Sequence, residues 1–450
     1  MRTIDRSRIA ELADREGQRF IADHPRSQEL ASDAAVHLLG GVPMPWMSRW
    51  PGAFPLFVDR AVGGSFVDVD GRTYIDLCLG DTGAMCGHAL PRLADTLGDQ
   101  ALRGITTMLP NQDAAWVAAE LTARFGLPVW QMAMTATDAN RFVLRFARQI
   151  TGRPKIAVFD WCYHGTVDET FAVLDAEGRV VERPGAIGPP VDPALTTRVI
   201  PFNDLGALEE ALAHGDVAVV LAEPAMTNIG IVQPEPGYWS AAQEIIASHG
   251  SLLAIDETHT ICAGPGGATV EWDLRPDFFI IGKAIAGGMP AAAYGMTEPI
   301  AVALGAAMGA DDIDISGIGG TLTGNALALA AIRTTLSTCL RPQDFEVTIP
   351  LAERWATGVA GVIDDAGLDW CVQQLGCRAE YWFSPLPRNG RDASLAGDHE
   401  LESLLHLYCL NRGILITPFH NMALFAPAHS NADVDRHTEV FADACAELVG

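Results

Sequence analysis

The sequence Ile280-Ile281-Gly282-Lys283-Ala284-Ile285-Ala286-Gly287-Gly288 places one lysine where an apolar segment meets a glycine-rich turn. The apolar residues before the lysine predict a buried strand. Lys155 and Lys283 are the two lysines of the chain. Burial disfavours a charged ammonium and therefore favours a neutral amine, which can form a Schiff base with a carbonyl group. A surface lysine whose stem lies over the sheet is the alternative.

A second apolar run ends in carboxylates upstream of this lysine. Residues 252–255 lead into Asp256 and Glu257, and Asp256 stands 27 positions before Lys283. In parallel sheets, ligands bind beyond the carboxyl ends of the strands, so a carboxylate at this point is well placed to meet one. The alternative is that Asp256 is a helix N-cap, since it precedes a turn.

Helical segments alternate with short apolar runs from about residue 112 onward. The helical segments are 112–125, 138–151, 205–213 and 239–249. The apolar runs are 156–159, 198–200, 217–222, 252–255 and 278–281. This alternation predicts an α/β domain with a mainly parallel sheet, and runs that are apolar at every position are typical of strands covered on both faces.

The two ends of the chain show other patterns. Residues 6–38 predict a helical region, and residues 57–77 predict strands joined by turns at Gly63-Gly64 and Asp70-Gly71. After about residue 330, helices near 346–365 and 398–412 and strands near 371–385 and 414–425 predict a smaller α+β domain. We therefore expect an N-terminal segment, 1–85, that packs with a C-terminal small domain, 331–450, and a large α/β domain at 86–330.

Composition limits the possible partners. The chain has 30 Lys and Arg against 56 Asp and Glu, a net charge of −26, which argues against nucleic acid and anionic membranes as partners. The N-terminus is charged and lacks the apolar region of a signal peptide, and no uncharged apolar run is long enough to span a membrane. Nine cysteines without zinc-site spacing predict reduced thiols in a cytoplasmic protein and no metal site.

Several common catalytic patterns are absent. The sequence contains no GxSxG and no HExxH motif, and the glycines at 264, 266 and 267 do not form GxGxxG. Gly282-Lys283 is not part of a phosphate-binding P-loop, because Ala284 stands where that motif has serine or threonine. What remains is the pair of strand ends with Asp256 and Lys283.

This pair, in its setting, resembles the class III aminotransferases, which are fold type I enzymes dependent on pyridoxal 5′-phosphate (PLP). The particular likeness is to the glutamate-1-semialdehyde aminomutase branch and its β-amino-acid transaminase relatives, and it runs from about residue 38 to residue 440. The markers stand in family order: GGVPMPW (40–46), DVDGRTYIDL (68–77), Gly87-His88, MTATDANRFVLRFARQITGR (134–153), WCYHGTVDE (161–169), AEPAMTNIG (222–230), IDETHT (255–260), GKAIAGGMP (282–290) and GGTLTGNALALAA (319–331).

The resemblance implies a cofactor site. Lys283 would form the Schiff base with PLP and move protons, and Asp256 would keep the pyridine nitrogen protonated so that the ring acts as an electron sink. The remaining implied cofactor contacts are Thr135, Ala136 and Thr137 at the phosphate, Tyr163 with His164 and Thr258 at the ring faces, Glu223 and Asn228 near the 3′-hydroxyl and substrate, and Thr321 at the cofactor of a neighbouring subunit. Ala136 replaces the family's glycine, and Thr135 with Asp138 also fits a plain capping box. His259 has no family role, and a structural one is the alternative.

The substrate side departs from the aminomutase pattern. Met44 and Met47 stand where that branch has a polar residue and an arginine, with Trp46 alongside, which favours a substrate with an apolar part. Arg49 and Arg378 are candidates for binding a carboxylate, with surface ion pairs as the alternative, and His420 is a further polar candidate.

The resemblance implies three possible functions. The main expectation is an aminotransferase that moves an amino group from an amino acid, β-amino acid or amine to a 2-oxo acid or aldehyde. The alternative is an aminomutase or racemase with the same cofactor, and a third possibility is a non-catalytic descendant. The position of Thr321 in the family further implies a homodimer with shared active sites.

Overall fold

The chain divides into two compact units. The computed structural model describes residues 4–188, 191–308, 317–418 and 420–450. The first unit contains residues 1–90, 343–386 and 396–450, and the second contains 91–342 and 387–395. None of the helices in the described ranges is long and apolar enough to cross a membrane.

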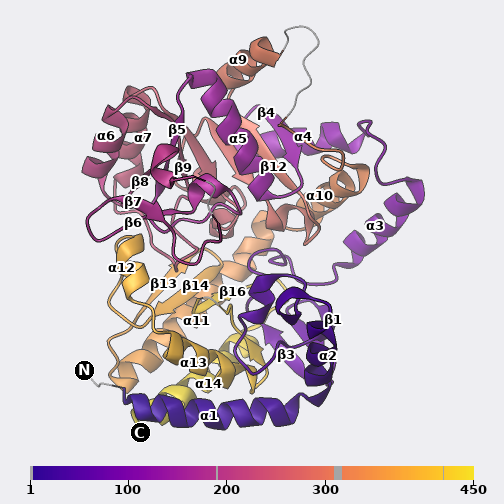
Figure 1. The fold of residues 1–450 in the computed structure, drawn as a ribbon. Helices are drawn as coiled ribbons and strands as arrows, with labels where there is room; N and C mark the ends of the chain where they lie inside the picture. Colours follow the sequence, from indigo (N-terminus) through magenta and orange to yellow (C-terminus); the bar gives the residue numbers. More distant parts are fainter. Residues whose placement is uncertain (1–3, 189–190, 309–316, 419) are drawn as a thin grey trace. The chain divides into compact units, whose positions relative to one another are not determined.

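The second unit is built on a seven-stranded sheet (Figure 1). In spatial order its strands are β4 (Val129–Ala133), β12 (Ala292–Met296), β11 (Phe278–Ile281), β10 (Leu252–Asp256), β9 (Val217–Ala222), β5 (Lys155–Phe159) and β8 (Thr197–Ile200). β12 pairs antiparallel with both of its neighbours, and the other pairs are parallel. The predicted α/β fold with a mainly parallel seven-stranded sheet is therefore confirmed.

Helices and one small hairpin surround this sheet. The helices of the second unit are α3 (Pro91–Arg103), α4 (Asp113–Phe125), α5 (Ala136–Thr151), α6 (Leu205–Ala213), α7 (Tyr238–Ser248), α8 (Gly267–Glu271), α9 (Glu298–Met308), α10 (Ala326–Thr338) and α12 (Gly390–Leu395). The hairpin is β6 (Ala172–Leu174) with β7 (Val180–Glu182). Helix α5 packs across β4 and β9 to β12, and its buried side includes Phe142, Val143 and Phe146. This packing fixes the N-terminus of α5 relative to the sheet.

The first unit combines both ends of the chain. Its helices are α1 (Arg6–Asp23), α2 (Pro25–Ala35), α11 (Pro342–Ala366), α13 (His399–Leu410) and α14 (Asn431–Val449). Its strands form a four-stranded sheet, β1 (Val58–Val62), β2 (Ser65–Asp68), β3 (Thr73–Asp76) and β15 (Ile414–Leu415), and a three-stranded sheet, β13 (Cys371–Leu375), β14 (Arg378–Trp382) and β16 (Met422–Leu424). The strands predicted within 57–77 are confirmed. The helical region predicted at 6–38 is wrong in its continuity, because the chain breaks at His24 and α2 begins with Pro25, which has no N–H to continue α1.

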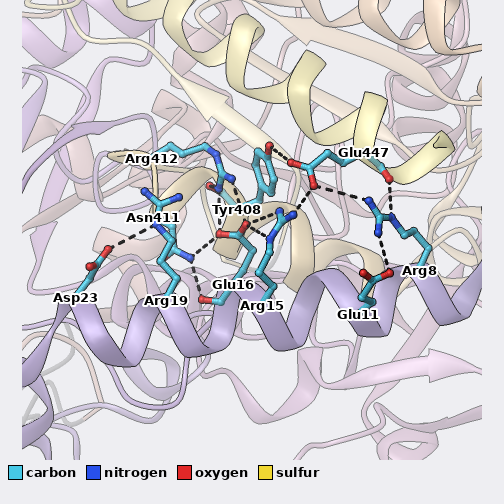
Figure 2. A network of polar contacts seen from close by, with 10 residues as sticks. All are labelled: Arg8, Glu11, Arg15, Glu16, Arg19, Asp23, Tyr408, Asn411, Arg412 and Glu447. Carbon is cyan, nitrogen blue, oxygen red and sulfur yellow. Dashed lines mark hydrogen bonds and ion pairs between the residues drawn. The ribbon is translucent and has the colours of Figure 1, made fainter.

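A buried carboxylate ties α1 to the C-terminal helices (Figure 2). Glu16 is only 1% exposed. Its side chain accepts hydrogen bonds from Asn411 Nδ2 at 2.8 Å and from Arg412 Nη1 at 3.0 Å. Arg15 bridges Glu16 and Glu447 of α14. Because burial alone raises the pKa of Glu16, its lowered pKa reflects these donors. The network anchors α1 against α13 and α14.

Candidate active site

Lys283 lies directly beyond the end of β11. It begins a short 3-10 helix, η6 (Lys283–Ala286), and has φ = 45°, in the left-handed region. This conformation costs a non-glycine residue about 1–3 kcal/mol and is found most often at functional sites. A Cβ on the preceding Gly282 would lie 3.1 Å from Ala136 Cβ and 3.3 Å from Ala136 N. Glycine at 282 therefore lets the lysine turn approach the first residue of α5.

Asp256 ends β10, which is the parallel neighbour of β11. Asp256 is paired with Ile280, so the two strand ends lie side by side. The Asp256 carboxylate is buried and accepts four hydrogen bonds. Oδ2 accepts from Asn140 Nδ2 at 2.9 Å and lies 3.0 Å from His164 Nδ1, while Oδ1 accepts from Thr258 N at 3.1 Å and Thr258 Oγ1 at 2.6 Å. Asp256 accepts from Thr258 N, but the N-cap of the 3-10 helix that follows is His259, so the alternative that Asp256 is a helix N-cap is wrong.

These contacts keep the Asp256 carboxylate ionised in a buried place. Burial by itself raises the pKa of Asp256, but the hydrogen bond and charge of His164, together with Thr258 and Asn140, hold this pKa well below its ordinary value. Burial lowers the pKa of His164, but the electrostatic interaction with Cys162 and the hydrogen bond with Asp256 raise it overall. The sheet edge thus carries a buried anion backed by an imidazole.

The N-terminus of α5 forms the other end of the site. Thr135 is its N-cap, with Oγ1 accepting from Asp138 N at 3.2 Å, which confirms the N-cap half of the predicted capping box. Thr137 Oγ1 accepts from Thr166 N at 3.0 Å. Gly165 has φ = 73°, and a Cβ on it would lie 2.0 Å from Thr137 Oγ1, so only glycine fits there. The first N–H groups of a helix lack intrahelical partners and favour anions, so this turn suits a phosphate.

Other predicted residues lie on loops of the same unit. Tyr163 is half-buried in the loop after β5, next to His164, and its ring meets Phe171 edge-on at 6.3 Å. Glu223 is buried directly after β9 and accepts from Thr227 Oγ1. Asn228 is partly buried in the loop that follows, and Thr321 is exposed before α10.

One side chain at the site received no role from the sequence. His259 lies three residues beyond Asp256, and its Nε2 is 2.8 Å from Lys283 Nζ. The two residues are 24 positions apart in the chain. The sequence shows only that each residue follows an apolar run, and it does not show that the two runs pair as neighbouring strands.

The site fits PLP in its chemical parts. A lysine amine suits an aldehyde, a buried carboxylate suits a protonated pyridine nitrogen, and a helix N-terminus suits a phosphate. Gly165 and Gly282 supply the close backbone approaches that side chains would block. The residues present would therefore hold this cofactor.

The candidate substrate residues belong to the first unit. Trp46 and Met47 lie in the short helix η2 (Pro45–Ser48) and are exposed, as is Arg49. Arg378 is 1% exposed, and its Nη2 donates to Thr82 Oγ1 at 2.6 Å and lies 3.5 Å from Asp81 Oδ1. His420 Nδ1 lies 3.6 Å from Glu380 Oε1. Binding of substrate by these five residues stays a prediction.

The sheet, its connections and the lysine turn define a PLP-dependent enzyme of fold type I. The aminotransferase class-III family model matches residues 46–348. The chain belongs to this family.

Individual relatives agree with this assignment. A glutamate-1-semialdehyde 2,1-aminomutase of Sorangium cellulosum is 34% identical over 92% of this chain and 94% of its own. A crystal structure of a glutamate-1-semialdehyde aminomutase from Pseudomonas aeruginosa PAO1 shares 47% identity, covers 99% of both chains and has a TM-score of 0.97. A β-phenylalanine aminotransferase from Variovorax paradoxus has 25% identity, 97% coverage of both chains and a TM-score of 0.86.

Proposed function

We propose that the chain is a PLP-dependent aminomutase, which moves an amino group between neighbouring carbons of one substrate molecule. The observation that carries the proposal is the placement of Lys283 and Asp256 at adjacent strand ends, within a fold that matches glutamate-1-semialdehyde aminomutases along nearly its whole length. The expected substrate class is an α-amino aldehyde that bears a carboxylate, as in the names of these relatives. This proposal replaces our main expectation of an aminotransferase by its alternative.

Each residue of the site has a part in this reaction. The bound cofactor supplies an electron sink for the negative charge that forms when the substrate carbon loses its proton. Asp256 offers a buried negative charge to the ring nitrogen, and the N-terminus of α5 holds the phosphate through Thr135, Ala136 and Thr137. Tyr163 and Thr258 would bound the ring faces. Lys283 would anchor the aldehyde and, once released, would carry a proton between the substrate Cα and the C4′ carbon of the cofactor.

Further contacts are expected from a second copy of the chain and from two candidate arginines. By family position, Thr321 reaches the cofactor phosphate of a second copy of the chain, so we propose a homodimer with shared sites. The exposure of Thr321 in the isolated chain agrees with this role. Arg49 and Arg378 are the two candidates for binding the substrate carboxylate. Arg378 is buried beside Asp81, which favours Arg49 for this role.

Transamination is the second candidate, and the exposed apolar side chains of Trp46 and Met47 favour it. Met44 and Met47 are each 42% exposed and stand where the aminomutase branch has a polar residue and an arginine, and Trp46, which is 39% exposed, lies alongside them. Such a wall suits the aromatic or aliphatic amino donors of transaminases. The β-phenylalanine aminotransferase at 25% identity shows that this activity occurs on the same fold.

The two functions differ in their need for a second substrate. The purified enzyme, loaded with cofactor, is given glutamate 1-semialdehyde alone, and the rearranged amino ketone, which has the same mass as the substrate, is separated from it by liquid chromatography before it is measured. An aminomutase converts many equivalents per site without a carbonyl acceptor. Conversion that stops after one equivalent, and resumes when a 2-oxo acid is added, would establish a transaminase. Lys283→Ala is the control for reaction that does not depend on the enzyme.

A further inference from the structure

A histidine lies within hydrogen-bond distance of the Lys283 amine. His259 Nε2 lies 2.8 Å from Lys283 Nζ, a hydrogen-bond distance between two nitrogens. His259 is buried, with 9% of its surface exposed. The contact joins the residue expected to hold the cofactor to a side chain that received no cofactor role from the sequence.

The chemistry of the two nitrogens limits the charge of this pair. An ammonium has only N–H donors and no acceptor, and a doubly protonated imidazole also has only donors. A hydrogen bond between them therefore needs a lone pair on one side, so at most one of His259 and Lys283 is charged. Lys155 has a different environment, because its Nζ donates to Ala194 O at 2.8 Å and lies 3.8 Å from the Asp216 carboxylate.

The backbone holds both partners in place. Glu257 N donates to Ile280 O at 2.8 Å, which extends the β10–β11 pairing to the residues just before the contact. Ile261 N donates to Glu257 O at 3.0 Å and Cys262 N to His259 O at 3.2 Å, which fixes the turn that carries His259. Lys283 is constrained by its left-handed φ and by the glycine before it. The contact therefore joins two fixed turns that follow the carboxyl ends of the neighbouring strands β10 and β11.

We propose that His259 is a positioning residue for Lys283: its imidazole holds the lysine amine whenever the amine is not bonded to the cofactor. The inference rests on the proposed role of Lys283. It goes beyond that role in assigning a second side chain to the attachment step and to the proton transfers that follow release of the amine.

The attachment step balances with His259 unchanged at its end. Lys283 Nζ forms a bond to the aldehyde carbon of the cofactor, and the carbon–oxygen double bond breaks. The two hydrogens of the neutral amine leave with the oxygen as water. Neutral His259 Nε2 is placed to accept the first of these protons and to return it to the departing oxygen. An amine held by His259 also keeps its own lone pair directed away from the imidazole, because the amine is the donor in that bond.

The test separates covalent attachment from simple binding. The full-length protein is freed of cofactor and compared in the wild-type form and as His259→Leu, which keeps bulk but cannot hydrogen-bond, and His259→Gln, which keeps an acceptor. Pyridoxamine phosphate, which lacks the aldehyde, measures non-covalent affinity by fluorescence titration. PLP measures the covalent step through the growth of its visible absorbance band in stopped flow. His249→Leu, which removes a histidine that contacts Glu209 elsewhere in the unit, is the matched control.

We expect His259→Leu to slow the covalent step at least about tenfold, equivalent to ~1.4 kcal/mol, while pyridoxamine phosphate affinity stays within about twofold of wild type. His259→Gln should recover part of the rate, and His249→Leu should match wild type. An unchanged covalent rate in His259→Leu overturns the inference. Equal losses in pyridoxamine phosphate binding and in the covalent rate also overturn it, because His259 would then act on the cofactor or on the fold. Failure of the wild-type protein to form the band would instead reject the proposed role of Lys283.

Discussion

The buried pair of Asp256 and His164 gives a prediction whose size follows from its contacts. Asp256→Asn keeps the shape of the side chain but removes its charge. The new amide nitrogen would face two donors, Asn140 Nδ2 and His164 Nδ1, which now bond to the carboxylate at 2.9 and 3.0 Å. The substitution therefore removes the carboxylate that His164 Nδ1 bonds to, while the imidazole stays fully buried.

The expected cost is unequal for the two partners. Removing one member of a buried, hydrogen-bonded charge pair costs about 3–5 kcal/mol, so Asp256→Asn should lie in that range. His164→Leu leaves the carboxylate with its bonds from Asn140 and Thr258, so its cost should be about 1–3 kcal/mol. The double variant should lose at least about 1 kcal/mol less free energy of unfolding than the sum of the two single losses, because it removes both partners of the buried pair together.

The pH of the measurement follows from the directions of the pKa shifts. The lowered pKa of Asp256 makes its contribution to stability present above its ordinary value of 3.8 and lost as pH falls through the shifted value. The raised pKa of His164 makes its contribution complete below 6.5 and lost as pH rises through the shifted value. The pair contributes fully between 3.8 and 6.5, and the loss caused by His164→Leu should shrink as pH rises above 6.5.

Urea denaturation of the cofactor-free protein, followed by tryptophan fluorescence, measures these differences. The four proteins of the cycle are compared at one pH inside the window and one above it. Additive losses within about 0.5 kcal/mol would refute the coupling of Asp256 to His164. A larger loss for His164→Leu than for Asp256→Asn would refute the direction of the argument.

Three further changes test other parts of the structure. Gly165→Ala should weaken binding of pyridoxamine phosphate at least about tenfold, because its Cβ would meet Thr137 Oγ1 at 2.0 Å; unchanged affinity would contradict the placement of the phosphate at α5. Thr135→Ala should lower unfolding free energy by about 1 kcal/mol through loss of the cap, as measured by urea titration. Glu16→Gln should cost about 1.5–3 kcal/mol in the same assay, whereas Glu11→Gln, on the exposed side of α1, should cost less than about 0.5 kcal/mol; equal effects would contradict the anchoring role of Glu16.

Much of the fold could be predicted because its central strands are apolar throughout. β5, β9, β10 and β11 are buried along almost their whole length, and such runs are recognisable without tertiary information. The same reasoning located Lys283 and Asp256, since each polar residue ends an apolar run. These strand ends carry the greater part of the candidate site.

The missed elements have less distinctive sequences. β12 reads Ala-Ala-Tyr-Gly-Met, and its small residues resemble a turn, although the strand is fully buried. Position 295 requires glycine, because a Cβ there would lie 2.8 Å from the ring of Trp130 on β4. The role of glycine at this point depends on a partner far away in the sequence.

The contact of His259 with Lys283 could not be predicted for a similar reason. Its two residues come together only when β10 and β11 pair in register, with Asp256 beside Ile280. The break at His24 is different, because Pro25 is itself a local sequence signal for the start of a new helix. Local signals were therefore sufficient for single elements, and pairing information was needed for contacts between them.

The attachment of PLP to Lys283 is tested most directly by reduction with borohydride. Reduction fixes the link between cofactor and lysine, and digestion with mass spectrometry then locates the added mass. Only two lysines exist, so Lys155 serves as an internal control in every sample. The account predicts that all of the phosphopyridoxyl mass lies on Lys283 and that Lys283→Ala carries none. Label on Lys155, or label that persists in Lys283→Ala, would contradict it.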